Sequence, residues 1–320
     1  MRNNPTVSTI VPTYNRASLL QDTLSSIKAQ TFSDWELLII DDGSSDGTET
    51  LVREHIKADA RIRYIKANHQ GVAAARNLGI KQAIGALVAF CDSDDLWLPE
   101  KLAYQVGYLQ AHPEISLVYS DVMSVCGSVV EDPSYFVLRP PAEGKVFRAL
   151  LERNFIANSS VVIRKACLES LGGFDASAVP SEDYDLWLRC AQDFLVGYVP
   201  QVLATIRRHG GNLTNGINVS YEAHLKVLQR IYAKSSDHTL RVLIKKACAA
   251  TYQRIGHDYL VQSEFSQARA AWYRSLQHDA LRLKVYGYLA VSLLPQPMVH
   301  QLRRVYSRLV RNRTLVETNS

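Results

Sequence analysis

The sequence has few cysteines, and none of them stands in a metal-binding or disulfide pattern. Five cysteines are scattered over the 320 residues, and no Cys-x-x-Cys pair occurs. Their number and spacing therefore indicate neither a zinc site nor a disulfide framework. A reducing, cytoplasmic compartment is the simplest expectation for such a chain.

Long apolar runs and phosphate-binding glycine motifs are also lacking. No run approaches the ~18 residues that a transmembrane helix needs, and no signal peptide is apparent at the N-terminus. The absence of GxGxxG and of GxxxxGKS or GxxxxGKT disfavours a Rossmann dehydrogenase and a P-loop NTPase. A sugar-nucleotide pyrophosphorylase is disfavoured because residues 12–16 contain no glycine.

Acidic residues are missing from one long basic stretch near the end of the chain. Between Arg282 and Arg313 there are seven Lys or Arg residues and no Asp or Glu. Within it, residues 283–299 combine Tyr, Leu and Val, which fits an interfacial membrane element. A packed helix with a solvated basic face fits the same residues equally well. The charge itself favours an acidic surface such as anionic lipid or nucleic acid.

Short apolar runs alternate with helical patterns at the start of the chain. They predict buried strands at residues 7–12, 35–40, 61–66 and 86–91. This alternation indicates an α/β fold with a parallel sheet flanked by helices. Ligands bind such sheets at the carboxyl ends of the strands. Because the polar loops 12–16, 41–48 and 92–95 all follow strands, we expect them to form one site.

The fourth predicted strand ends in three carboxylates, Asp92, Asp94 and Asp95. Carboxylates this close repel one another, and a cation would offset the cost. Mg2+ and Mn2+ prefer oxygen ligands and bridge to substrate phosphates. Taken alone, the same residues also fit a solvated acidic turn before a helix that begins near Pro99.

The second half of the chain has a different pattern. Strands are expected at 117–125, 128–130, 159–164 and 195–206, the last one broken at Pro200, and helices at 146–153, 165–171 and 181–192. Residues 207–212 predict a basic, flexible loop, and the chain is helical from Ser220, with a hairpin break near Ser263. We expect one α/β domain over 1–218, with a donor half (about 1–115) and an acceptor half (about 116–218), and a helical region over 219–320.

Six motifs, in the expected order, resemble those of the family 2 glycosyltransferases. They are VSTIVPTYNR (7–16), DDGSSDGT (41–48), the Gly71–Gly79 segment with Ala-Arg-Asn, DSDD (92–95), GGFD (172–175) and EDYDLWLR (182–189). The resemblance implies the GT-A fold, with a Rossmann-like, mostly parallel sheet flanked by helices and here a helical C-terminal extension. It also implies metal-assisted, inverting transfer of a sugar from a nucleotide-sugar donor, expected to be UDP-linked, to an acceptor hydroxyl. Single-sugar addition is expected because the Gln-x-x-Arg-Trp motif and transmembrane helices of processive synthases are lacking.

The resemblance also assigns the donor site and the metal site. Donor-contacting residues would be Pro12, Thr13, Tyr14, Asn15, Asp42, Arg76, Asp92 and Glu182. Metal ligands for Mn2+ or Mg2+ would be Asp94, with Asp95 in support and His209 near the metal or the phosphate. Without the resemblance, Tyr14 fits a core aromatic, Asp42 an N-cap, Arg76 a surface charge and His209 a solvated loop residue.

Asp183 matches the position of the catalytic base in this family. Successive helical residues point about 100° apart, so Asp183 and its neighbour Glu182 cannot both face the acceptor squarely. Alternatively, both acids simply stabilise a helix N-terminus, an effect worth about 0.3–1 kcal/mol each.

The partners implied by the resemblance are a nucleotide sugar and a glycan or lipid-linked glycan acceptor in cell-surface polysaccharide synthesis. Peripheral contact with an anionic membrane, at the inner face of the plasma membrane, is expected, and nucleic acid is not. The alternative is a catalytically weak nucleotide-sugar-binding or scaffold protein that uses the helical C-terminal region. Intact Asp94 and Asp183 argue against that alternative.

Overall fold

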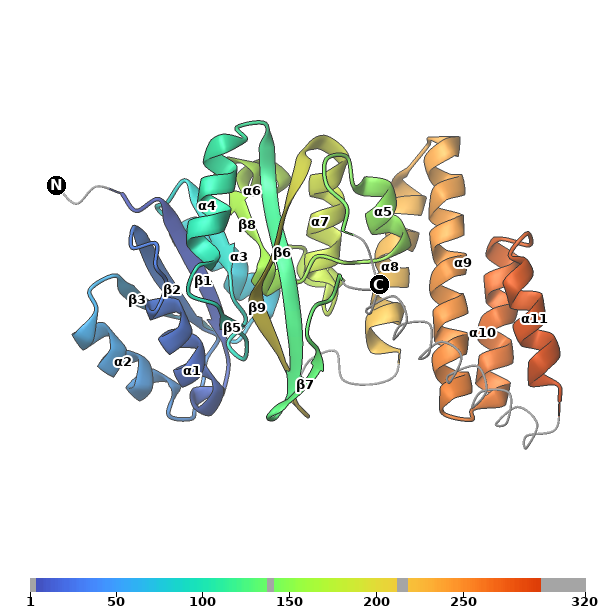
Figure 1. Ribbon diagram of the computed structural model, residues 1–320, viewed down its shortest axis with the longest axis horizontal. Coiled ribbons are helices and arrows are strands. Elements are labelled where there is room, and N and C mark those ends of the chain that lie inside the picture. Colours follow the sequence, from blue (N-terminus) through green and yellow to red (C-terminus); the bar gives the residue numbers. More distant parts are fainter. Residues whose placement is uncertain (1–3, 137–140, 212–217, 295–320) are drawn as a thin grey trace, which may run out of the picture. The chain divides into compact units, whose positions relative to one another are not determined.

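The computed structural model describes residues 4–136, 141–211 and 218–294 (Figure 1). These residues fall into two compact units, one within 1–215 and 222–230 and the other within 216–221 and 231–320. The first unit contains a nine-stranded sheet in the order β3-β2-β1-β4-β8-β6-β9-β5, with β7 paired to β6. The second unit is helical.

The first four strands of the sheet are parallel, as the alternating pattern predicts. The elements of this half are β1 (Val7–Thr13), α1 (Ala17–Lys28), β2 (Trp35–Asp41), α2 (Thr48–Ala58), β3 (Ile62–Lys66), α3 (Val72–Gln82) and β4 (Leu87–Phe90). Every residue of β1, β2 and β4 is buried. Such continuous burial is expected of parallel strands covered on both faces. Helix α1 contributes Leu20, Leu24 and Ile27 to the core from one face.

The sheet becomes mixed after β4. Its further elements are β5 (Leu96–Trp97), α4 (Lys101–Ala111), β6 (Ile115–Cys126), β7 (Val129–Asp132), α5 (Phe147–Glu152), β8 (Val162–Arg164), α6 (Lys165–Leu171), α7 (Glu182–Asp193) and β9 (Leu195–Arg208). Strand β8 runs antiparallel to both β4 and β6, while β6 and β9 are parallel. Figure 1 shows the long strands β6 and β9 crossing the middle of this unit. The carboxyl ends of β6 and β9 lie at the same edge of the sheet as the carboxyl end of β4.

Three local predictions for the second half are wrong. Pro200 does not break a strand, because β9 continues past it with register shifts against β6 that accommodate the missing N–H. Arg207 and Arg208 are the last residues of β9 and pair with β6, so they are not part of a flexible loop. Ser159 belongs to a 3-10 turn, η1 (Asn158–Ser160), that precedes β8. The last residue of the predicted loop, Asn212, lies outside the described residues.

The helical end of the chain consists of α8 (Val219–Lys234), α9 (His238–Val261), α10 (Phe265–His278) and α11 (Leu283–Ser292). The predicted hairpin break is confirmed, because Ser263, with a φ of 66°, lies between α9 and α10. A Cβ on Gly256 would lie 2.3 Å from Trp272 Nε1, so these two helices need glycine there to pack this closely. No helix among the described residues is long and apolar enough to cross a membrane. The basic segment beyond residue 294 lies outside the described residues.

Candidate active site

The loops that follow β1 and β2 are tied together at the carboxyl edge of the sheet. The Asn15 backbone N–H donates to Ser44 Oγ at 2.8 Å, and Ser45 N–H donates to Asn15 Oδ1 at the same distance. Pro12 and Thr13 are buried at the end of β1, and the Thr13 carbonyl accepts a hydrogen bond from Asp42 N–H at 2.8 Å. The structure therefore brings together the two loops expected to hold the base and ribose.

Tyr14 and Asp42 both contact the loop that leads into α3. Tyr14 is 44% exposed and stacks on His69, with ring centroids 4.2 Å apart, so it is not a core aromatic. Asp42 is buried and accepts hydrogen bonds from the N–H groups of Gln70 and Gly71, both at 2.8 Å. The carboxylate therefore fixes the backbone beside an exposed aromatic pair, a surface on which a flat ring can stack.

Arg76 connects two groups of acids that are far apart in the sequence. The side chain is buried, so the alternative of a surface charge is excluded. Its Nη2 donates to Asp92 Oδ1 at 2.6 Å and its Nη1 to Glu182 Oε1 at 2.5 Å. Burial lowers the pKa of Arg76, but Asp92 and Glu182 outweigh that effect and raise it overall. One guanidinium thus links the acidic turn after β4 to the start of α7.

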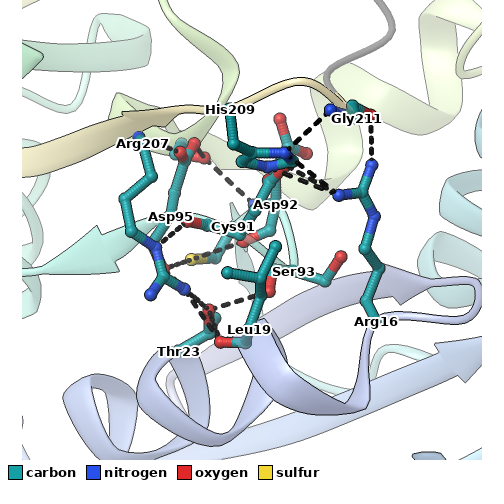
Figure 2. Close-up of polar contacts among 12 residues, drawn as sticks. Arg16, Leu19, Thr23, Cys91, Asp92, Ser93, Asp95, Arg207, His209 and Gly211 are labelled. Atoms are coloured by element: carbon teal, nitrogen blue, oxygen red, sulfur yellow. Dashed lines mark hydrogen bonds and ion pairs between the residues drawn. The ribbon is translucent and has the colours of Figure 1, made fainter. Parts of the chain in front are cut away.

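Two residues of the η1 turn hold the acidic turn from the other side. Asn158 Nδ2 donates to Asp92 Oδ1 at 2.9 Å, and Ser159 Oγ accepts from the Asp92 backbone N–H at 3.0 Å. Ser159 Oγ also donates to Asp95 Oδ2 at 2.5 Å. The Arg207 N–H donates to Asp95 Oδ1 at 3.1 Å (Figure 2). Burial and the nearby Asp92 and Asp94 raise the pKa of Asp95 well above its usual range. Asp95 therefore serves as an anchor for β9 and η1.

Asp94 lies beside His209, which follows the end of β9. His209 Nε2 is 2.9 Å from Asp94 Oδ2, and both side chains are partly exposed. Arg16 Nη1 is 3.3 Å from His209 Nε2 and 4.0 Å from Asp94 Oδ2. No group of three or more His, Cys, Asp or Glu side chains suited to a metal is present within residues 4–136, 141–211 and 218–294. One carboxylate and one imidazole fit a Mg2+ or Mn2+ ion that takes its other ligands from water and a diphosphate.

Asp183 and Glu182 occupy different environments in the first turn of α7. Glu182 is buried against Arg76, and its Oε2 has no hydrogen-bond partner among the described residues. Asp183 is half-buried and accepts a hydrogen bond from the Tyr184 N–H at 2.6 Å. Burial of the carboxyl group, with the negative charge of Glu182 next to it, raises the pKa of Asp183 to about 7. A carboxylate with such a pKa is suited to exchanging a proton at neutral pH.

The N-cap of α7 differs in detail from the prediction. Ser181 occupies the N-cap position, but its side chain makes no cap hydrogen bond within the described part of the chain. Asn158 and Ser159 were not predicted as site residues, and Arg16 was predicted only as part of the 12–16 loop, without a role of its own. The run Ser-Ser-Val-Val-Ile after Asn158 is typical of a strand, and no local signal indicated that it meets the acidic turn.

The order of the strands and the acidic turn at the edge of the sheet define the GT-A fold. The structure is similar to that of the mannosyltransferase PcManGT from Pyrobaculum calidifontis, solved in complex with GDP-Man and Mn2+. The TM-score is 0.63 at 20% identity, and the match covers 97% of this chain and 88% of that one. The sequence profile of Glycosyl transferase family 2 matches residues 8–171. The chain belongs to glycosyl transferase family 2.

Curated relatives resemble the same part of the chain. An uncharacterized glycosyltransferase of Rickettsia felis is 33% identical over 214 residues, or 65% of this chain and 34% of that protein. The Escherichia coli UDP-Glc:alpha-D-GlcNAc-diphosphoundecaprenol beta-1,3-glucosyltransferase WfgD is 33% identical over 188 residues, which is 58% of this chain and 70% of that enzyme. The chain spans about a third of the length of the first curated relatives that it matches, at 34%, 34% and 29%.

Proposed function

We propose that this chain transfers a single sugar from a nucleotide sugar to an acceptor hydroxyl, with inversion at the anomeric carbon. The proposal rests on the two hydrogen bonds of the Arg76 guanidinium, one to Asp92 of the donor loops and one to Glu182 beside Asp183. A donor held by the loops after β1, β2 and β4 would have its reactive carbon near the start of α7. This arrangement supports one reaction centre between the two acid groups.

Asp183 would act as the catalytic base. In this role its carboxylate accepts the proton of the acceptor hydroxyl while the acceptor oxygen bonds to the anomeric carbon and the bond from that carbon to the diphosphate oxygen breaks. The nucleoside diphosphate then leaves, and the configuration at the carbon inverts. The pKa of about 7 supports this role, because a base works best when its pKa lies near the working pH.

The leaving diphosphate needs positive charge. Asp94 and His209 would hold Mn2+ or Mg2+, and Asp95 would support them by keeping Ser159 and the end of β9 in place. When bound, the cation would neutralise the charge that develops on the diphosphate. Asp92 would bind the ribose in an orientation that Asn158 and Arg76 maintain. Tyr14, Asn15 and Asp42 would form the wall of the base site.

A UDP-linked donor and a lipid-linked glycan acceptor are the preferred substrates in this proposal. The name of the Escherichia coli relative specifies UDP-glucose and a diphosphoundecaprenol-linked sugar. The similar structure from Pyrobaculum calidifontis contains GDP-Man with Mn2+ instead, so the nucleotide base of the donor must be determined by experiment. We place the reaction in cell-surface glycan synthesis at the inner face of the plasma membrane, with the basic C-terminal segment in peripheral contact with anionic lipid.

A donor screen followed by a turnover assay tests the proposal. Thermal melting with Mn2+ and a panel of UDP- and GDP-sugars should single out a donor, because a ligand at 100 times its dissociation constant adds about 2.7 kcal/mol of stability. That donor, mixed with lipid-diphosphate-linked sugar acceptors, should release nucleoside diphosphate. Stabilisation by a donor without release for any acceptor would favour the binding or scaffold alternative.

A further inference from the structure

The guanidinium of Arg16 places a permanent positive charge beside Asp94 and His209, the two side chains proposed to bind the metal. It follows the exposed loop after β1 and reaches the end of β9, where its Nη2 donates to the Gly211 carbonyl at 2.5 Å. Its Nη1 lies 3.3 Å from His209 Nε2 and 3.5 Å from His209 Nδ1 (Figure 2). The same nitrogen lies 4.0 Å from Asp94 Oδ2. The guanidinium therefore contacts the ring nitrogen and approaches the carboxylate oxygen that a divalent cation would use.

These contacts put two cations in conflict. A guanidinium keeps its proton at any pH a protein tolerates, so its charge cannot be removed to make room for a metal. Asp94 contributes a single negative charge. Like charges a few ångströms apart repel strongly in a partly buried site, and the side chains of Arg16 and Asp94 are 24% and 14% exposed. A metal and the guanidinium cannot both occupy this position at low cost.

We propose that Arg16 is a movable counter-cation that competes with the divalent metal for the Asp94–His209 pair and gives up that pair when a nucleotide diphosphate binds. The inference rests on the proposed metal-assisted transfer. A diphosphate brings several anionic oxygens, which favour the metal and also attract the displaced guanidinium. The planar fork of Arg is well suited to two phosphate oxygens. Arg16 comes directly after Tyr14 and Asn15 of the donor loop, so its backbone already lies beside the proposed nucleotide.

Competition of this kind links metal binding to nucleotide binding. In the free protein Arg16 weakens the metal site, and with nucleotide present it becomes an extra contact to the diphosphate. Linkage is reciprocal, so the factor by which UDP raises Mn2+ affinity equals the factor by which Mn2+ raises UDP affinity. Replacing Arg16 with a neutral residue should reduce this factor in two ways. Mn2+ should bind more tightly in the absence of nucleotide, and UDP should bind more weakly.

Calorimetric titration with Mn2+, with and without UDP, tests the inference on the intact chain. Without UDP, Arg16→Gln should bind Mn2+ about 5- to 10-fold more tightly than the wild type, and Arg16→Lys, which keeps the charge, should show a smaller gain. The matched control is Arg208→Gln, which removes the same charge next to His209, from a side chain that is 68% exposed and pairs with Glu131. Its Mn2+ affinity should stay close to that of the wild type, and thermal melting verifies that each variant is folded.

The outcomes separate this inference from the proposed function. An Arg16→Gln variant that is folded and binds Mn2+ with unchanged or lower affinity overturns the inference, even if sugar transfer is observed. An equal gain for Arg208→Gln also overturns it, because the effect would then be general electrostatics. If Arg16→Gln alone gains affinity, the inference holds whether or not a donor and an acceptor have been found.

Discussion

The acidic turn after β4 and the first turn of α7 contain similar residues in different surroundings. In the acidic turn, Asp92 and Asp95 accept hydrogen bonds from Asn158, Ser159 and the Arg207 backbone, and Asp94 lies against His209. At α7, Asp183 accepts a bond from a neighbouring N–H and lies next to a second acid, and its pKa is about 7. The first group is held by donors from several segments, whereas Asp183 accepts its hydrogen bond from the N–H of the next residue in its own helix.

In the proposed function, this difference separates a metal ligand from a catalytic base. Carboxylates fixed by hydrogen bonds and packed side by side form a site that gains from a cation. A carboxylate with a raised pKa beside a like charge can instead take up and release a proton near neutral pH. Arg76 bonds an acid of each group. The two groups are therefore close together, and the proposed tasks of binding metal and accepting a proton differ because the local surroundings of the carboxylates differ. The variants below test whether the tasks can be separated.

Replacing Asp183, the proposed base, should have the largest effect. Asp183→Asn should reduce turnover by about 10²- to 10⁴-fold and leave UDP affinity unchanged, because the amide keeps the shape but cannot accept the proton. Nucleoside diphosphate release and calorimetry measure the two quantities. Asp193→Asn, at the exposed far end of the same helix, is the matched control and should behave like the wild type. If Asp183→Asn retained most of its activity, Asp183 would not be the base.

Removing Asp94, the proposed metal ligand, should weaken the Mn2+-dependent binding of UDP. Asp94→Ala should abolish the increase in UDP affinity that Mn2+ produces, because the carboxylate that lies 2.9 Å from His209 Nε2 is lost. Calorimetry with Mn2+ and with a chelator gives the comparison. Asp183→Asn is the cross-control, since it should keep the Mn2+-linked increase. An unchanged Mn2+-linked affinity in Asp94→Ala would remove the distinction between the two acid groups.

The pH dependence should report the environment of Asp183. The base must be ionised, so kcat/KM should fall as pH decreases through about 7, the raised pKa of Asp183, approaching tenfold per unit at lower pH. Glu182→Gln removes the like charge that raises this pKa, and the acidic limb should move to lower pH. A pH–rate profile of both proteins checks the shift. A limb that stayed in place or moved upward would show that another group controls the reaction.

Loosening the acidic turn should have the smallest effect. Asn158→Ala removes the hydrogen bond to Asp92, a loss of about 1 kcal/mol that corresponds to a roughly fivefold higher KM for the donor. Asn158→Asp should be worse, because it has nearly the same shape but adds a repelling charge next to Asp92. Initial rates at varied donor concentration measure the change. Wild-type KM in both variants would rule out a positioning role for Asn158.

The first half of the fold was predictable because its signals are local. Apolar runs that end in polar loops indicate parallel strands, and parallel strands place Asn15, Asp42 and Asp94 at one edge of the sheet. The contacts that complete the site join distant segments. Asn158 meets Asp92 across 66 residues and Arg16 meets His209 across 193, and no periodicity reports such pairs. The course of β9 past Pro200 likewise depends on its pairing with β6.

The bridge made by Arg76 also limits how this chain could be re-engineered. Its guanidinium is buried and shared between Asp92 and Glu182, so a change made to admit a different sugar at one end would shift the acid at the other. Lys could not replace it, because a single ammonium group lacks the fork that spans two carboxylates. Libraries for altered donor choice should therefore keep Arg76, Asp92 and Glu182 constant and diversify positions such as His69 and Ser44, which contact Tyr14, Asp42 and Asn15 of the donor loops.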